Sequence, residues 1–111
     1  MNRAYPALAI AVAFVCLSHV ASAAPVSQTC QRDALVMLSE VREARAELAE
    51  AATASDKERC AAWRKQAATL RKASAFYKRC QTGAERDRNV ANANAGVAQY
   101  DGAARSQCGD K

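Results

Sequence analysis

Histidine is absent from the chain after His19, and residues 24–111 also lack isoleucine. Without histidine this part of the chain cannot form a Ser–His–Asp or Cys–His catalytic set, nor a histidine metal site. It contains no glycine-rich phosphate-binding loop, and none of its serines lies in a G-x-S-x-G turn. We therefore predict that the protein is not an enzyme, with no catalytic residue and no cofactor.

Large apolar side chains are scarce as well. Leu, Val and Phe together supply ten of the 88 residues from position 24 onward, whereas alanine alone supplies 21. Alanine buries little surface, so a single small domain of this composition has a thin core. No stretch alternates apolar and polar residues between turn signals, which argues against a β-sheet. The composition predicts an all-α domain that needs covalent support.

The N-terminus has the pattern of a secretory signal peptide. A basic residue, Arg3, precedes an apolar stretch from Ala7 to Leu17, and small residues end at Ala23. The stretch is shorter than the ~20 apolar residues that a membrane-spanning helix needs. We expect cleavage after Ala23, and an uncleaved amphipathic anchor is the alternative.

Cleavage would remove residues 1–23, including Cys16, and leave residues 24–111 as one domain without a transmembrane segment. In this domain 15 basic residues face 11 acidic ones, a net charge of +4. The short basic start and the alanine-rich signal favour a bacterial protein that is exported to the periplasm or secreted. Its cysteines could be reduced and separately buried, but disulfides are favoured because exported proteins enter an oxidising compartment.

Four cysteines remain after cleavage: Cys30, Cys60, Cys80 and Cys108. An even number of cysteines in a short exported chain predicts a disulfide framework. No C-x-x-C pair occurs, which argues against zinc sites, thioredoxin-like redox chemistry and haem attachment.

Apolar periodicity predicts three helices, at about 30–52, 56–80 and 84–106. Their apolar rows follow the 3–4 spacing of one helix face: Ala34, Met37, Val41, Ala44, Leu48 and Ala51; Cys60, Trp63, Ala67, Leu70, Ser74 and Tyr77; Val90, Ala93, Val97, Tyr100 and Ala104. Short connections favour antiparallel neighbours. The expected fold is a small antiparallel three-helix bundle stapled by two disulfides.

Capping signals mark the helix starts. Thr29 can cap the first helix, and Ser55 with Glu58 has the spacing of a capping box. Thr82 with Glu85 has the same spacing before the third helix, and Gly83 suits a left-handed backbone position between the last two helices.

Helix geometry selects one disulfide pairing from three. Cys60 and Cys80 lie 20 residues apart on one helix, about 30 Å at ~1.5 Å per residue, whereas a disulfide needs Cα atoms within about 7 Å. Pairing Cys30 with Cys60 or with Cys108 would join opposite ends of an antiparallel bundle. We therefore predict the pairs Cys30–Cys80 and Cys60–Cys108.

An acidic row on the first helix is one candidate site. It consists of Glu40, Glu43, Glu47 and Glu50, spaced 3, 4 and 3. Such a row could hold a hard cation such as Ca²⁺, dock a basic partner, or form ion pairs with basic residues of the second helix. Ion pairing or simple solvation is the favoured interpretation, because the sequence lacks a calcium-binding loop.

The basic face of the second helix is the other candidate site, defined by Arg64, Lys65, Arg71, Lys72, Lys78 and Arg79. A basic helical face can bind anionic lipid, lipopolysaccharide, a cell-wall polymer or an acidic protein, or it can simply be solvated. The aromatics are not interleaved for base stacking, so we expect no nucleic acid. Phe76 either packs under the Cys30–Cys80 disulfide or is an exposed anchor for a partner.

These features favour a small non-catalytic binding protein of the bacterial envelope, such as an inhibitor, an immunity protein or an adaptor, whose partner is another envelope or secreted protein. A peripheral binder of anionic envelope surfaces is the alternative, and a small enzyme is the least favoured class. Salt dependence separates the first two, because surface electrostatics weaken with ionic strength.

Overall fold

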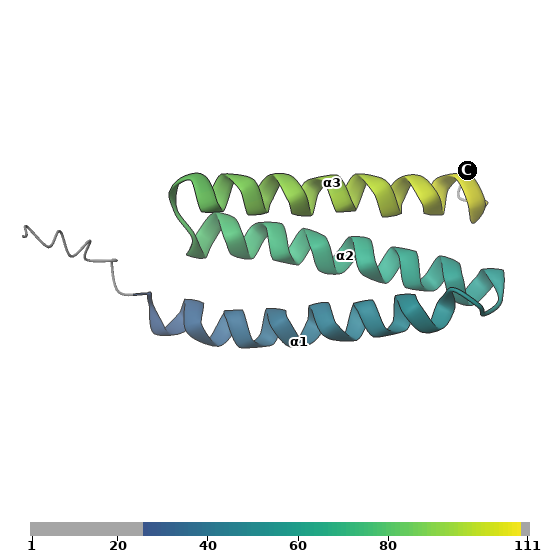
Figure 1. Ribbon diagram of the computed structural model, residues 1–111, viewed down its shortest axis with the longest axis horizontal. Helices are drawn as coiled ribbons and strands as arrows, with labels where there is room; N and C mark the ends of the chain where they lie inside the picture. The colour runs from purple at the N-terminus through teal and green to yellow at the C-terminus, as the bar shows by residue number, and fades with distance from the viewer. Residues whose placement is uncertain (1–25, 110–111) are drawn as a thin grey trace, which may run out of the picture.

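The computed structural model describes residues 26–109, which form three antiparallel helices (Figure 1). The helices are α1 (Gln28–Ala51), α2 (Asp56–Cys80) and α3 (Gly83–Gln107). The predicted all-α class and helix order are confirmed; both ends of α2 are as predicted, and the ends of α1 and α3 differ by one or two residues. The predicted signal peptide, its cleavage site and Cys16 lie outside the described residues.

The helix starts differ in how they are capped. The hydroxyl of Ser27, rather than Thr29, caps α1 and accepts the backbone N–H of Cys30 at 3.1 Å. The prediction for Thr29 was wrong because the helix begins two residues earlier and Thr29 already lies inside its first turn. The capping box of α2 is confirmed: the N–H of Glu58 donates to Ser55 Oγ, and the N–H of Ser55 donates to the Glu58 carboxylate.

The predicted second capping box, at the start of α3, is not formed. Within residues 26–109 Thr82 makes no side-chain capping bond, and the carboxylate of Glu85 accepts the side-chain amide of Gln81 at 3.3 Å rather than the N–H of Thr82. Gly83 has a φ of 64°, so the expected left-handed position is confirmed there. The sharp change of direction between α2 and α3 depends on this glycine.

Helix α2 packs against both neighbours through two different faces. The predicted apolar row faces α3, since Leu70 approaches Gly96, and the hydroxyl of Ser74 donates to Asn94 Oδ1 at 2.9 Å. A second row, which sequence analysis missed, faces α1 and consists of Ala62, Gln66, Thr69, Ala73, Phe76 and Cys80. At 100° per residue the two rows are separated by about 110° around α2.

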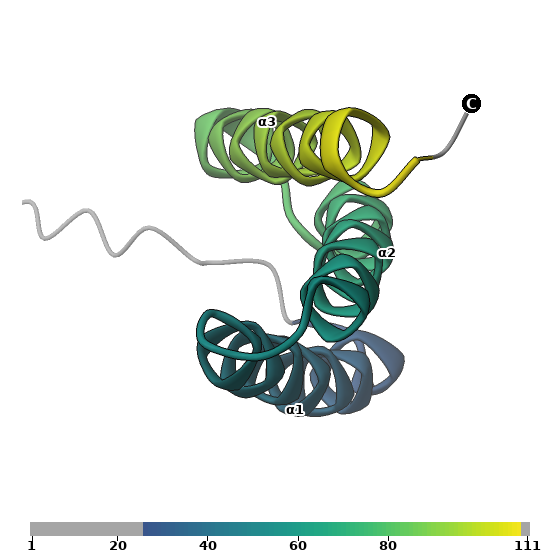
Figure 2. The same ribbon diagram turned by 90° about the vertical axis from the view of Figure 1, so that its right-hand side faces the viewer.

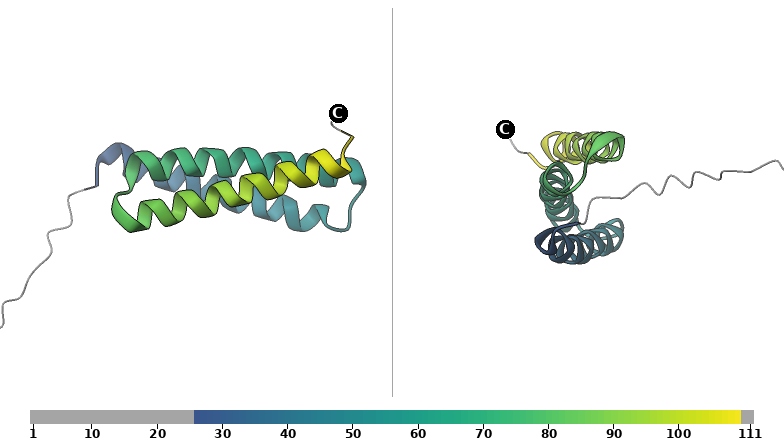
Figure 3. Two further views of the ribbon diagram at one scale, coloured as in Figure 1. Left: turned by 90° about the horizontal axis from the view of Figure 1, so that it is seen from above. Right: turned by 90° about the vertical axis from the view of Figure 1, so that its left-hand side faces the viewer.

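This angle is too wide for a closed triangle of helices. Within the described residues α1 and α3 do not contact each other, and each packs only on α2. Viewed along the helices, the three form an arc with α2 in the middle (Figures 2 and 3). The bundle is therefore open on one side.

Both predicted disulfides are confirmed, and each ties α2 to one neighbour at opposite ends of the molecule. Cys30–Cys80 joins α1 to the end of α2 with a Cα–Cα distance of 5.6 Å. Cys60–Cys108 joins the start of α2 to the end of α3 at 5.8 Å. The two disulfides provide the covalent support that we predicted from the scarcity of large apolar residues.

The core consists almost entirely of small side chains. Its buried apolar residues are Cys60 and seven alanines: Ala44, Ala51, Ala62, Ala67, Ala73, Ala93 and Ala104. Among the described residues no large side chain is fully buried. Gln66, Thr69 and Ser74 are also buried, and Gln66 Oε1 has no hydrogen-bond partner among the residues that the structure describes. Alanine lets helices approach closely but contributes little burial energy, which confirms the expected thin core.

Candidate functional site

The acidic row of α1 lies beside two lysines of α2. Lys65 Nζ donates to a carboxylate oxygen of Glu43 at 2.8 Å and also to Glu47. Lys72 Nζ lies 3.2 Å from an oxygen of Glu40. Three of the four glutamates thus form ion pairs across the α1–α2 interface, as the favoured interpretation expects. Glu50 is exposed and has no ion pair within residues 26–109.

The lysine contacts change the ionisation of this row. The hydrogen bond from Lys65, reinforced by its positive charge, lowers the pKa of Glu43 below its usual 4.5. The same bond to Glu43, and a second to Glu47, raise the pKa of Lys65 above 10.5. In the part of the chain that the structure describes, no three His, Cys, Asp or Glu side chains converge as a metal site. An ammonium group occupies the position between Glu43 and Glu47.

The basic face of α2 is largely engaged in ion pairs with the neighbouring helices. In addition to Lys65 and Lys72, Arg79 pairs with Asp33 of α1 at 2.7 Å, and Arg71 pairs with Asp101 of α3. Lys78 is exposed and has no ion pair to any described residue.

Sequence analysis missed Asp33 and Asp101 as partners of this face. Asp33 could have been found from the disulfide pairing. Cys30–Cys80 fixes the register of α1 against α2, and that register brings Asp33 beside Arg79. Asp101 had a weaker signal, because it lies about two helical turns from Cys108, and Arg71 lies about three turns from Cys60, so the disulfide fixes their register less closely.

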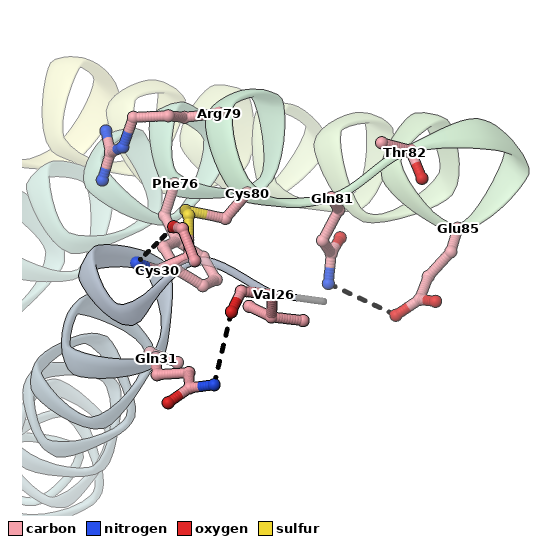
Figure 4. Close-up of a pocket in the computed structure, with 11 residues that line it drawn as sticks. Val26, Cys30, Gln31, Phe76, Arg79, Cys80, Gln81, Thr82 and Glu85 are labelled. Atoms are coloured by element: carbon pink, nitrogen blue, oxygen red, sulfur yellow. Dashed lines mark hydrogen bonds between the residues drawn. A yellow bond between two sulfur atoms is a disulfide. The ribbon is translucent and has the colours of Figure 1, made fainter. Parts of the chain in front are cut away.

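Phe76 lies beside a cavity of about 760 Å³ at the end of the molecule where α1 begins (Figure 4). It is half-buried, lies one turn before Cys80 and lines the cavity together with the Cys30–Cys80 disulfide. Its ring contacts that of Tyr77 edge-on, with centroids 5.7 Å apart. Phe76 therefore lies next to the disulfide, and its exposed part lines the cavity, which Val26 and Ala34 also line.

The most exposed large apolar side chains are on the first half of α1, and sequence analysis did not identify them. Leu35 is 71% exposed, Val36 53% and Leu38 47%, with Val26 just before the helix at 57%. The signal was available in the sequence, since Leu35 and Leu38 fall off the alanine-rich row that packs on α2.

Comparisons with protein-family models, curated proteins and solved structures gave no match to this chain.

Proposed function

We propose that the protein is an exported, non-catalytic binding protein that acts through its helical surface on another envelope or secreted protein. The observation that carries this proposal is the exposure of leucine. Residues 24–111 contain four leucines, and two of them, Leu35 and Leu38, lie largely at the surface of α1. In a chain with so few large apolar residues, an exposed apolar cluster indicates an interaction surface.

Export is supported by the predicted signal peptide and by the two disulfides, because disulfides persist in oxidising compartments. Within residues 26–109 no helix is long and apolar enough to cross a membrane. Action without turnover is supported by the lack of histidine after His19 and by the absence of catalytic motifs in the sequence. Inhibitors, immunity proteins and adaptors all work in this way.

The alternative is binding of an anionic envelope surface through the basic face of α2. The ion pairs of Lys65, Arg71, Lys72 and Arg79 weaken this alternative, since their charges are already matched by carboxylates of the same chain. Lys78 is the member of the face that best tests it, because changing Lys78 breaks no ion pair among the described residues.

Capture of proteins from the envelope of the source cell tests the proposal. The bait is the oxidised protein without residues 1–23, and the eluates are compared at low and high salt. We expect a salt-resistant captured protein that is lost with Leu35→Gln plus Leu38→Gln and retained with Lys78→Gln. Capture of anionic lipid or polymer that disappears at high salt and with Lys78→Gln would support the alternative. If nothing is captured by the wild-type bait, the proposed function is wrong.

A further inference from the structure

Helix α1 carries a second row of side chains, distinct from the one that packs on α2. Leu35, Leu38, Arg42 and Arg45 are spaced 3, 4 and 3, so they follow one another along one face. All four are exposed. The centre of this outer row lies about 140° around the helix from the buried Ala44, at 100° per residue. The outer row is therefore two leucines followed by two arginines on a face that no described residue covers.

The two arginines of the outer row have no acidic partner within residues 26–109. The positions three and four residues away from each are occupied by apolar, serine or arginine side chains, so the helix supplies no local carboxylate. The acidic row lies on the opposite flank of α1, where the lysines of α2 engage it. Arg42 and Arg45 themselves are three residues apart and repel each other slightly. Added carboxylates would relieve this repulsion.

We infer that the outer row binds an amphipathic helix of a partner protein, one that presents apolar residues and carboxylates in a matching row. This inference rests on the proposed function and specifies its surface. Leu35 and Leu38, at the i, i+3 spacing of one helix face, would pack against the apolar residues of the partner helix. The arginines would bind its carboxylates, which guanidinium groups recognise through two parallel hydrogen bonds. Leucine supplies burial, and arginine fixes the direction and register.

A second copy of this chain fits the outer row poorly. An antiparallel pair of outer rows places Leu35 opposite Arg45, and a parallel pair places the arginines of the two copies together. Residues 1–25 fit no better, because that segment contains no Asp or Glu to match the arginines. A lipid surface favours a broad apolar face, whereas this row has only two large apolar side chains.

A photo-crosslinking side chain at Ala49 tests the inference, because Ala49 continues the outer row by one turn and its replacement leaves the four row residues intact. The matched control places the same side chain at Ala95, an exposed position on α3. The oxidised protein without residues 1–23 is irradiated in envelope extract, and the adducts are mapped by mass spectrometry. We expect a protein adduct from position 49 but not from position 95, on a helical segment that contains Asp or Glu.

Two double variants separate the leucines from the arginines. Leu35→Gln with Leu38→Gln, and Arg42→Glu with Arg45→Glu, should each lower the adduct yield about tenfold or more, as expected for interface anchors. Lys78→Gln is the control and should not change the yield. Circular dichroism checks that each variant keeps its helicity.

Four outcomes would overturn the inference while leaving the proposed function intact, provided that a partner protein is still captured. They are an adduct to a second copy, an adduct to lipid, an adduct at position 95 alone, and yields unaffected by the arginine variants. If the wild-type protein captures no protein at all, the proposed function fails together with the inference.

Discussion

The α1–α2 hairpin and the α2–α3 hairpin share one helix and are closed by disulfides of nearly equal span, 50 and 48 residues. They differ in what lies between the helices. Across α1–α2, ion pairs predominate, with Lys65, Lys72 and Arg79 of α2 bound to carboxylates of α1. Across α2–α3 there is one ion pair, Arg71–Asp101; in addition, a glycine lets a leucine side chain approach closely, and a buried serine bonds to an asparagine.

This difference indicates that α1 is the less firmly docked helix. Exposed ion pairs contribute at most about 1 kcal/mol each and weaken with salt, whereas close packing does not depend on ionic strength. Docking of α1 should therefore depend chiefly on Cys30–Cys80 and on a few alanines. A helix with weaker internal packing and exposed leucines is suited to face a partner rather than the core.

Removal of one disulfide at a time should give the largest effect. The spans predict a similar loss of stability of about 4 kcal/mol for either pair, from the gain in unfolded-chain entropy. The pattern of the loss should differ. With Cys30→Ala and Cys80→Ala, we expect amides of α1 to exchange fastest, while α2 and α3 remain protected. Hydrogen exchange resolved by helix, together with denaturation followed by circular dichroism, provides the measurement.

The second disulfide provides the control for this experiment. With Cys60→Ala and Cys108→Ala, the close packing at Gly96 and the bond to Ser74 should keep most of α3 protected. If α3 is released more readily than α1 is released by the first pair of changes, the interfaces have the opposite ranking and the comparison is wrong.

The sequence was sufficient to predict the helix order and both disulfides, because an intact helix fixes how far apart Cys60 and Cys80 must be. It did not predict the open arc. Four of the six residues on the second face of α2 are Ala62, Gln66, Thr69 and Ala73, and their weak hydrophobic contrast hides this face from periodicity analysis.

Surface and core were harder to separate on α1 than on α2. The helix carries leucines outside its buried row and small alanines within it, so residue size and burial do not correlate. The ion pairs of the basic face were partly foreseeable, since a charged row on each of two adjacent helices favours contact. Which carboxylate meets which cation depends on the register that the packing sets.

Enlarging Gly96 should produce the next largest effect. A Cβ at this position would lie 2.6 Å from Leu70 Cδ1. Leu70 can shift to admit a methyl group, so Gly96→Ala should be nearly neutral. Gly96→Leu overpacks the α2–α3 interface and should cost about 1–3 kcal/mol. Urea denaturation measures both variants.

Gly102 is the matched position for that series. It lies on the same helix, and a Cβ there would meet nothing within 4 Å. Gly102→Ala should stabilise the protein by up to ~1 kcal/mol through helix propensity alone. Equal responses at Gly96 and Gly102 would show that the α2–α3 interface is looser than its geometry indicates.

The two helix connections should respond differently to the loss of a hydroxyl. Ser55→Ala removes the capping bond to the N–H of Glu58 and should cost about 1 kcal/mol. Thr82→Ala removes no capping bond and should change stability little. Melting of the two variants, measured side by side, checks this contrast. A larger loss from Thr82→Ala would mean that its hydroxyl caps α3 in solution.

The smallest expected effect is the pH dependence of the α1–α2 interface. The pKa of Glu43 is lowered by Lys65, so its stabilising contribution is present above pH 4.5 and is lost as the pH falls through the lowered value. The pKa of Lys65 is raised, so its contribution is present below pH 10.5 and is lost as the pH rises through the raised value. Thermal melting between these limits should therefore show a plateau, with a decline on either side.

Lys65→Met should reduce both declines, because it removes the shared partner, whereas Lys78→Met should leave them unchanged. Both declines should also shrink in high salt, since salt screens the exposed Lys65–Glu43 pair from which both shifts arise. If Lys65→Met leaves the acidic decline unchanged, that decline must arise from other carboxylates, among them Glu58, whose pKa is lowered by the N–H of Ser55.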